Sequence, residues 1–312
     1  METRRIGTLA VSVVGLGCNN FGGRLDRSGT QAVVDAALAA GVNFFDTADM
    51  YGDTRSEVLL GQALGGRRGQ AVVATKFGWR IDDQRHGAKP AYVRQAVEDS
   101  LGRLGTDRID LYQLHQPDPE TPIAETLAVL DELVREGKVR EIGCSNFSAA
   151  QLREAQEAVR AGAARFVSVQ NEYSLVQREP EREVLAECER QGLAFLPFFP
   201  LASGLLTGKY RRGAPLPTGT RLAGKSGFAN RFLNQRNLAL ADALADFAAR
   251  RGHSLLELAF SWLLSRGPVC SVIAGAMSAE QVRANVAAAG WRLTADELAE
   301  VDQIERLAPP RS

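Results

Sequence analysis

Several residues with titratable side chains directly follow apolar runs in this chain. The segment FFDTADMYGDTRSE (residues 44–57) places Asp46 after two phenylalanines and Tyr51 five residues later. Lys76 ends the run AVVATK, and His115 ends the run IDLYQLH. A carboxylate, a phenol, an amine and an imidazole can donate and accept protons, so together they could carry out acid–base chemistry. Such chemistry requires that the preceding runs bring the four side chains to one place.

The apolar runs are predicted to be β-strands, because their rich Val, Ile, Leu and Phe content is typical of strands covered on both faces. Eight such runs cover residues 13–17, 42–48, 71–76, 109–115, 139–146, 166–170, 193–199 and 270–276. Amphipathic runs at helical spacing lie between them, and one of these (residues 121–137) ends on a glycine, as helices often do. Eight strands, each followed by a helix, predict an α/β fold of the (β/α)8 TIM barrel type. A doubly wound open sheet would show the same alternation.

In an α/β barrel, the C-terminal ends of the strands meet on one face and carry the active site. In this chain those ends bear Asp46, Lys76, His115, Ser145, Asn146 and Gln170, and Tyr51 lies in the loop after Asp46. Taken alone, each residue has a purely structural interpretation. An aspartate can cap a helix, a lysine can end a strand in solvent, and a histidine or tyrosine can pack in a core. Their occurrence at matching strand ends favours one shared site.

Two segments depart from the strand–helix repeat. Residues 4–14 (RRIGTLAVSVV) precede the first repeat and are predicted to form a β-hairpin that plugs the bottom of the barrel. Residues 207–231 are rich in Gly, Pro and Arg, so they are predicted to form a long loop over the C-terminal face. Because no Gly-rich linker or repeat divides the chain, residues 1–312 are expected to form a single domain.

Composition and charge are those of a soluble globular protein, with 45% apolar and 24% charged residues. The 37 basic and 37 acidic residues cancel, so no net charge favours nucleic acid or an anionic membrane as a partner. No apolar run is long enough to span a bilayer, and residues 1–10 lack the apolar core of a signal peptide. The four cysteines are scattered without ligand-like or paired spacing, which favours reduced thiols in a cytoplasmic protein and no metal site.

These segments resemble the aldo-keto reductase family. DTADMYGDTRSEVLLGQAL (residues 46–64) resembles that family's signature around a catalytic aspartate and tyrosine, and LHQP (114–117) resembles its histidine motif. GCSNF, VQNEY and VIAGAMSAEQVRAN resemble its cofactor-binding segments. SGLLTGKY resembles the branch that contains microbial reductases and the β-subunits of potassium channels. The resemblance covers nearly the whole chain and implies NAD(P)H-dependent reduction of aldehydes or ketones on a TIM barrel.

The resemblance also implies a role for each of the four titratable residues. Tyr51 would donate a proton to the carbonyl oxygen, which becomes negative as hydride reaches the carbon. Lys76, held charged by Asp46, is expected to lower the pKa of Tyr51, because an ammonium favours a neighbouring phenolate. His115, as a neutral donor, would orient and polarise the carbonyl.

A nicotinamide dinucleotide lying across the top of the barrel is a further implication of the resemblance. Ser145, Asn146 and Gln170 would bind its carboxamide, Phe198 would stack on its ring, and residues 200–209 would surround its pyrophosphate. The expected cofactor contacts are Cys18, Asn19, Asp46, Tyr51, Ser145, Asn146, Gln170, Phe198, Phe199, Pro200, Leu201, Ala202, Gly204, Lys209, Arg221, Gly275, Met277, Gln281 and Asn285.

The adenosine end of this site departs from the family pattern. Met277 stands where Lys, Arg or Ser commonly contacts the adenosine 2′-phosphate, and a thioether cannot pair with a phosphate. Lys209 and Arg221 still favour NADPH, with NADH as an alternative. The substrate walls are expected to be Asn19, Phe21, Met50, Trp79, His115 and Phe199, which suit a hydrophobic or aromatic aldehyde or ketone.

Two other interpretations compete with a reductase. A Schiff-base lyase would use Lys76 as its nucleophile, which requires a lowered lysine pKa, whereas the neighbouring Asp46 keeps the amine charged. A cofactor-sensing regulatory subunit would keep the same residues and show weak turnover. The expected partner is a small carbonyl substrate, and a monomer is favoured.

Overall fold

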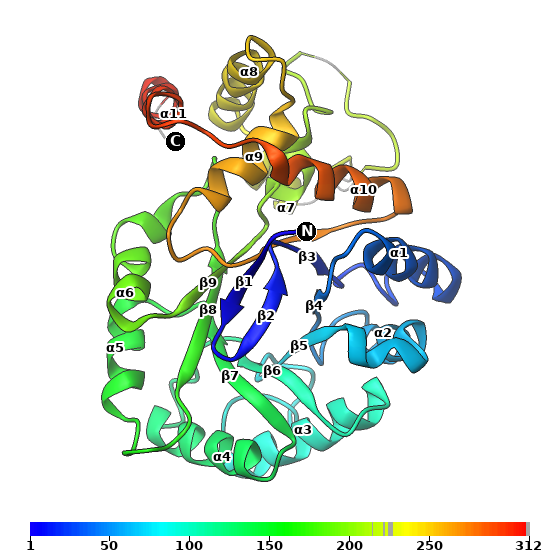
Figure 1. Ribbon diagram of the computed structural model, residues 1–312, viewed down its shortest axis with the longest axis vertical. Helices are drawn as coiled ribbons and strands as arrows, with labels where there is room; N and C mark the ends of the chain where they lie inside the picture. Colours follow the sequence, from blue (N-terminus) through cyan, green and yellow to red (C-terminus); the bar gives the residue numbers. More distant parts are fainter. Residues whose placement is uncertain (214, 221, 224–226, 310–312) are drawn as a thin grey trace.

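The computed structural model of the chain describes residues 1–213, 215–220, 222–223 and 227–309. Its centre is an eight-stranded parallel sheet in the order β10-β3-β4-β5-β6-β7-β8-β9 (Figure 1). The strands are β3 (Val14–Gly17), β4 (Phe44–Asp46), β5 (Val72–Phe77), β6 (Ile109–Leu114), β7 (Val139–Ser145), β8 (Phe166–Glu172), β9 (Ala194–Phe198) and β10 (Val272–Gly275). The two end strands approach each other, since Phe195 of β9 pairs with Val269, just before β10. The sheet thus closes almost completely, which confirms the TIM barrel and excludes the open sheet.

Helices cover the outside of the barrel (Figure 1). The α-helices are α1 (Arg27–Ala39), α2 (Arg55–Leu64), α3 (Pro90–Leu104), α4 (Ile123–Arg135), α5 (Ala149–Glu157), α6 (Val184–Gln191), α7 (Gly227–Phe232), α8 (Gln235–Ala249), α9 (Leu255–Leu264), α10 (Ala279–Ala287) and α11 (Ala295–Leu307). Short 3-10 helices are η1 (Gly65–Gln70), η2 (Glu179–Glu181), η3 (Ala202–Thr207) and η4 (Ala288–Gly290). Sequence signals fix several helix starts, because Ser148, Ser254 and Thr294 form capping boxes that satisfy the first backbone N–H groups.

The N-terminal hairpin consists of β1 (Thr3–Ile6) and β2 (Leu9–Ser12), paired antiparallel. Its buried residues Ile6, Leu9 and Val11 pack with side chains from the barrel interior, among them Phe44 and Leu196. The hairpin lies across the barrel in the view of Figure 1. The predicted plug is therefore confirmed, and its apolar face explains why Ile6, Leu9 and Val11 are buried whereas Arg5 and Ala10 are exposed.

Most strand bounds differ from the expected ones by one or two residues, and two differences bear on the site. The second strand covers only Phe44–Asp46 rather than residues 42–48, because the chain turns after Asp46 while its N–H groups still bond to the next strand. Thr47 donates to the Ala74 carbonyl and Asp49 donates to the Lys76 carbonyl. The expected loop over residues 207–231 is also wrong at its end, since α7 begins at Gly227.

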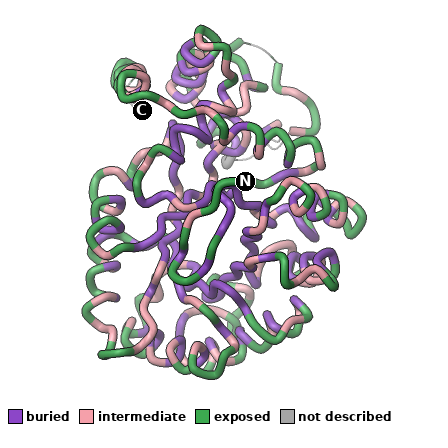
Figure 2. The backbone as a smooth tube through the Cα atoms, viewed as in Figure 1, coloured by how far each residue is buried: buried purple, intermediate pink, exposed green. Residues whose placement is uncertain are grey.

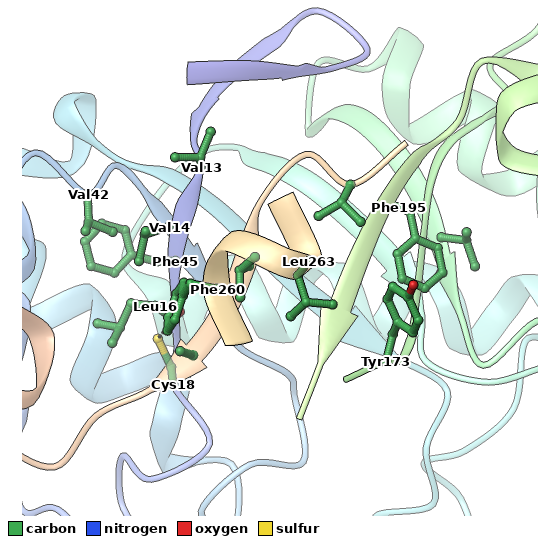
Figure 3. Close-up of a cluster of buried hydrophobic side chains, with 14 of the residues drawn as sticks. Val13, Val14, Leu16, Cys18, Val42, Phe45, Tyr173, Phe195, Phe260 and Leu263 are labelled. Atoms are coloured by element: carbon green, nitrogen blue, oxygen red, sulfur yellow. Dashed lines mark hydrogen bonds between the residues drawn. The ribbon is translucent and has the colours of Figure 1, made fainter. Parts of the chain in front are cut away.

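The main apolar core lies between the strands and the surrounding helices. Val14 and Leu16 of β3 and Phe45 of β4 belong to this core together with Phe260 and Leu263 of α9 (Figure 3). Figure 2 shows that the barrel strands are largely buried, whereas the helices expose their outer faces. Within the described ranges, no helix is long and apolar enough to cross a membrane.

Candidate active site

A cavity of about 820 Å³ opens at the C-terminal ends of the strands. It is lined by residues from the strand ends, from the loops that follow them and from α10. The expected site residues in its lining are Cys18, Asn19, Asp46, Met50, Tyr51, Trp79, His115, Ser145, Asn146, Gln170, Phe198, Phe199, Pro200, Leu201, Gly204, Lys209, Gly275, Met277, Gln281 and Asn285. The closed barrel therefore brings together residues that lie far apart in the sequence.

Asp46 and Lys76 form a buried ion pair at the floor of this cavity. The Lys76 Nζ donates to Asp46 Oδ2 at 2.7 Å and to the Thr47 carbonyl at 2.8 Å. The Lys76 side chain is only 1% exposed and the Asp46 side chain 5%, so each charge is stabilised by the other rather than by water. The other carboxylate oxygen of Asp46 accepts from Gln170 Nε2 at 2.9 Å and from Gln113 Nε2 at 3.4 Å.

Tyr51 lies beside this ion pair, on the loop between β4 and α2. The Lys76 Nζ is 5.1 Å from the centre of the Tyr51 ring, and the His115 ring centre is 5.8 Å away, edge to face. The next residue, Gly52, has a φ of 58°, and a Cβ there would lie 2.3 Å from the Phe21 carbonyl oxygen. The loop can pass this point only with glycine, which explains the Tyr-Gly pair in the sequence.

The pKa values in this group are set by burial and by the Asp46–Lys76 pair. Burial lowers the pKa of Lys76, but Asp46 and Tyr51 outweigh it, so the pKa of the amine lies above its ordinary value. Tyr51 is partly exposed to the cavity, yet desolvation raises its pKa more than Lys76 lowers it. Lys76 therefore acts on the Tyr51 pKa in the expected direction, but desolvation is larger and leaves that pKa above its ordinary value.

His115 faces the cavity opposite Tyr51 and next to Trp79, whose ring centre is 5.2 Å from that of the imidazole. Desolvation, followed by the charge of Lys76, holds the pKa of His115 well below its usual range. The imidazole is therefore neutral at neutral pH and can donate one N–H without bringing a charge.

The other end of the cavity has features that suit a phosphate-containing ligand. The consecutive residues Ala202, Ser203 and Gly204 all have positive φ values, of 46°, 57° and 97°. They form a turn in which the Ala202 N–H donates to the Phe199 carbonyl and the Gly204 N–H donates to the Leu201 carbonyl. The Ser203 Oγ is buried and has no hydrogen-bond partner among the described residues. Lys209 lies above Gly204, since a Cβ at that glycine would be 2.9 Å from the lysine Nζ. These residues fit the dinucleotide that the sequence implies.

Three expected site residues that the structure describes are not part of the cavity lining. Phe21 is fully buried in the apolar core and does not line the cavity, so its assignment to the substrate wall is wrong. Ala202 is likewise fully buried, and its backbone shapes the turn. Lys76 lies below the cavity floor, where it contacts Asp46. Arg221 lies outside the described residues.

The cavity also contains residues that the sequence did not suggest. These are Gly17, Asn20, Arg24, Glu172, Ser203, Thr207, Gly219, Thr220, Arg231, Leu256, Ile273, Ala274 and Ala284. Most of them come from loops or helices whose path over the barrel cannot be derived from periodicity. The ion pair between Arg231 and Glu172 joins α7 to the end of β8, and Arg24 donates to the Gly219 carbonyl at 3.4 Å. Some of these residues had a signal in the sequence. Ser203 and Thr207 lie inside the run 200–209, and the segments VQNEY and VIAGAMSAEQVRAN contain Glu172, Ile273, Ala274 and Ala284.

Comparison with known proteins gives a consistent result. The model of the Aldo/keto reductase family matches residues 13–306. An uncharacterized oxidoreductase, YqkF of Bacillus subtilis (strain 168), is 35% identical over 308 residues, which cover 96% of this chain and 94% of the relative. A probable voltage-gated potassium channel subunit beta of Oryza sativa subsp. japonica is 36% identical over 276 residues, 86% of this chain and 84% of the relative.

A solved structure agrees with these relatives. The glycerol dehydrogenase AKR11B4 from Gluconobacter oxydans superimposes with a TM-score of 0.85 at 32% identity, covering 99% of this chain and 97% of that one. The family model and the superimposed structure each cover nearly the whole chain. The chain therefore belongs to the aldo/keto reductase family.

Proposed function

We propose that this oxidoreductase uses NADPH to reduce hydrophobic or aromatic aldehydes and ketones to alcohols. The observation that carries the proposal is the buried Asp46–Lys76 pair, which lies beneath Tyr51 and opposite a neutral His115 at the floor of one large cavity. This arrangement presents a proton donor and a hydrogen-bond donor to the same point, as carbonyl reduction requires.

Tyr51 acts as the proton donor in this proposal. Its raised pKa keeps the phenol protonated at neutral pH, and the Lys76 ammonium stabilises the phenolate that forms once the proton has left. Asp46 keeps Lys76 charged and fixes its position through the 2.7 Å contact. His115 donates its N–H to the carbonyl oxygen and so orients the substrate. Met50, Trp79 and Phe199 supply the apolar walls.

A bound nicotinamide dinucleotide supplies the hydride for this reaction. Ser145, Asn146 and Gln170 would bind its carboxamide. Two of them are already oriented by main-chain carbonyls, since Ser145 Oγ donates to the Gln170 carbonyl and Asn146 Nδ2 donates to the His115 carbonyl. Ser203, whose Oγ has no partner among the described residues, and Lys209 would bind its phosphates. Lys209 and Arg221 favour NADPH over NADH, although Met277 adds no charge for a 2′-phosphate.

Absorbance loss of the reduced nicotinamide tests the proposal. Purified protein would receive a panel of aromatic and aliphatic aldehydes, with NADPH and NADH in parallel. We expect turnover with NADPH that is fastest for aromatic or long-chain aldehydes. Faster turnover with NADH would refute the cofactor choice, and a preference for small charged carbonyl compounds would refute the substrate class.

A Schiff-base lyase is the weaker alternative, because the pKa of Lys76 is raised whereas a nucleophilic amine needs a lowered one. Borohydride treatment with substrate would trap an adduct on Lys76 if this alternative held. A cofactor-sensing subunit is a second alternative, motivated by the relative named as a potassium channel subunit beta. Tight NADPH binding with slow turnover of every carbonyl compound would favour it over a metabolic reductase.

We further propose that residues 1–312 act as one catalytic domain in a cytoplasmic monomer whose only partners are small molecules. The balanced charge of the chain supports this view, since it offers no attraction to nucleic acid or anionic membranes. Light scattering of the purified protein would test it, and a mass twice that of the chain would refute the monomer.

A further inference from the structure

Asp49 connects two members of the catalytic group through the backbone. It lies between Asp46 and Tyr51, and its N–H donates to the Lys76 carbonyl at 3.0 Å. The Tyr51 N–H in turn donates to the Ala48 carbonyl at 3.2 Å, on the other side of Asp49. A displacement of Asp49 would therefore move the loop that carries Tyr51 relative to the strand that carries Lys76.

The carboxyl group of Asp49 is buried in surroundings that do not suit a negative charge. Asp49 is 1% exposed and is absent from the described lining of the cavity. Its Oδ2 accepts a long hydrogen bond of 3.4 Å from the Tyr92 hydroxyl of α3, and its Oδ1 has no partner among the described residues. A buried carboxylate with one bare oxygen carries a large desolvation cost.

The groups that face Asp49 from neighbouring elements add to this cost. Glu57 of α2 brings a second buried carboxylate. Arg103 of α3 is the nearby cation, but its Nε already donates to Glu57 at 2.6 Å. Tyr92 of α3 and Tyr112 of β6 bring only neutral phenols, whose pKa values are raised. The surroundings therefore favour the protonated form of Asp49.

We propose that Asp49 is a positioning residue for Tyr51: the loop keeps the geometry described above while the Asp49 carboxyl group is protonated, and it leaves that geometry when the proton is lost. Reduction would then fall as Asp49 ionises, although Asp49 touches neither substrate nor cofactor. This inference rests on the proposed function, because it takes Tyr51 as the proton donor.

The expected range of pH follows from the burial of the group. Desolvation, and then the charge of Glu57, raise the pKa of Asp49 from 3.8 to about 7, whereas Arg103, the Met50 backbone and Tyr92 act more weakly in the other direction. The protonated fraction of such a group falls from roughly 0.9 at about pH 6 to roughly 0.1 at about pH 8. Tyr51 ionises far above this range, because its own pKa lies above the ordinary value of 10.0.

The pH profile of kcat/KM for aldehyde reduction tests the inference at saturating NADPH. We expect the wild type to lose about ninefold between about pH 6 and pH 8, in step with the protonated fraction of Asp49. Asp49→Asn should show no such fall, because an amide does not titrate. Asp53→Asn is the matched control: this aspartate lies in the same loop but its side chain is 98% exposed, so the variant should keep the wild-type profile.

Tyr92→Phe gives an independent arm should Asp49→Asn fail to fold. Removing the Tyr92 hydroxyl removes a contact that favours the ionised carboxyl group, so the fall should move to higher pH. NADPH binding, followed by fluorescence, should be equal in all variants. If the fall in kcat/KM persists in Asp49→Asn, or lies at the same pH in Tyr92→Phe as in the wild type, this inference is refuted while the proposed function stands. A wild type without turnover at any pH would refute the proposed function and this inference with it.

Discussion

Replacing Asp49 by asparagine should change how the stability of the folded protein depends on pH. The pKa of Asp49 is raised from 3.8 to about 7 by folding, so the folded state binds more protons than the unfolded state between these values. The free energy of unfolding of the wild type therefore falls as the pH rises through this window, and the contribution of Asp49 is lost above about pH 7. Asparagine does not titrate and contributes no such fall.

The size of this change in the free energy of unfolding depends on how much of the pH range between the two pKa values of Asp49 the experiment covers. Each unit of pH within the window is worth about 1.4 kcal/mol, so the two units from about pH 5 to pH 7 amount to about 3 kcal/mol. The free energy of unfolding of Asp49→Asn minus that of the wild type should rise by this amount between about pH 5 and pH 8. Most of the rise should be complete near pH 7, where about half of the folded molecules have an ionised Asp49, and the rise should end near pH 8, where the carboxyl group has ionised in both states.

Urea unfolding of the wild type, Asp49→Asn and the control Asp53→Asn across this pH range would measure the difference. Because the comparison is between variants, titrations shared by all three proteins cancel. The control should track the wild type, since the Asp53 side chain is exposed in the folded state. A rise smaller than about 1 kcal/mol, or one of opposite sign, would show that Asp49 is already ionised in the folded protein at about pH 6, against this account.

Two further substitutions test other parts of the site. Met277→Arg should raise the ratio of kcat/KM for NADPH to kcat/KM for NADH by about tenfold or more, because one charge-assisted contact to a phosphate has an effect of this size. An unchanged ratio would mean that Met277 does not face the 2′-phosphate. Gly52→Ala should destabilise the protein by about 1–3 kcal/mol and lower turnover, because Gly52 has a positive φ and an added Cβ would lie 2.3 Å from the Phe21 carbonyl oxygen. Gly23→Ala is the control, since no atom lies within 4 Å of the Cβ added there. Equal unfolding midpoints for the two variants would contradict the reasoning.

Residues at the strand ends could be predicted from the sequence because strand runs and barrel topology determine their positions. Lys76 and His115 end runs of apolar residues, and parallel strands in a closed barrel bring such ends to one face. The β-hairpin plug was also predictable, because residues 4–14 precede the first strand–helix repeat. The rest of the site depends on long-range paths. Arg24 reaches the cavity from a loop and Arg231 reaches it from α7, and the local sequence does not determine how either segment passes over the barrel.

The pKa values could not be predicted from residue types alone. The Lys76 ammonium does act on Tyr51 in the expected direction, but desolvation by the surrounding protein is larger and reverses the result. For Asp49, desolvation and then the charge of Glu57 of α2 raise the pKa, and the sequence motif alone shows neither the burial nor the neighbour. Phe21 shows the same limit for packing, because an apolar residue near a strand end can face either the cavity or the core.

The role of Tyr51 as proton donor is the central claim, and Tyr51→Phe tests it most directly. Oxidation of NADPH by the best aldehyde would be followed by absorbance in the wild type and the variant, with NADPH binding measured separately by fluorescence. We predict that the variant keeps cofactor binding and loses reduction by about 10²-fold or more, the scale of a missing general acid. Wild-type turnover in Tyr51→Phe would contradict the claim.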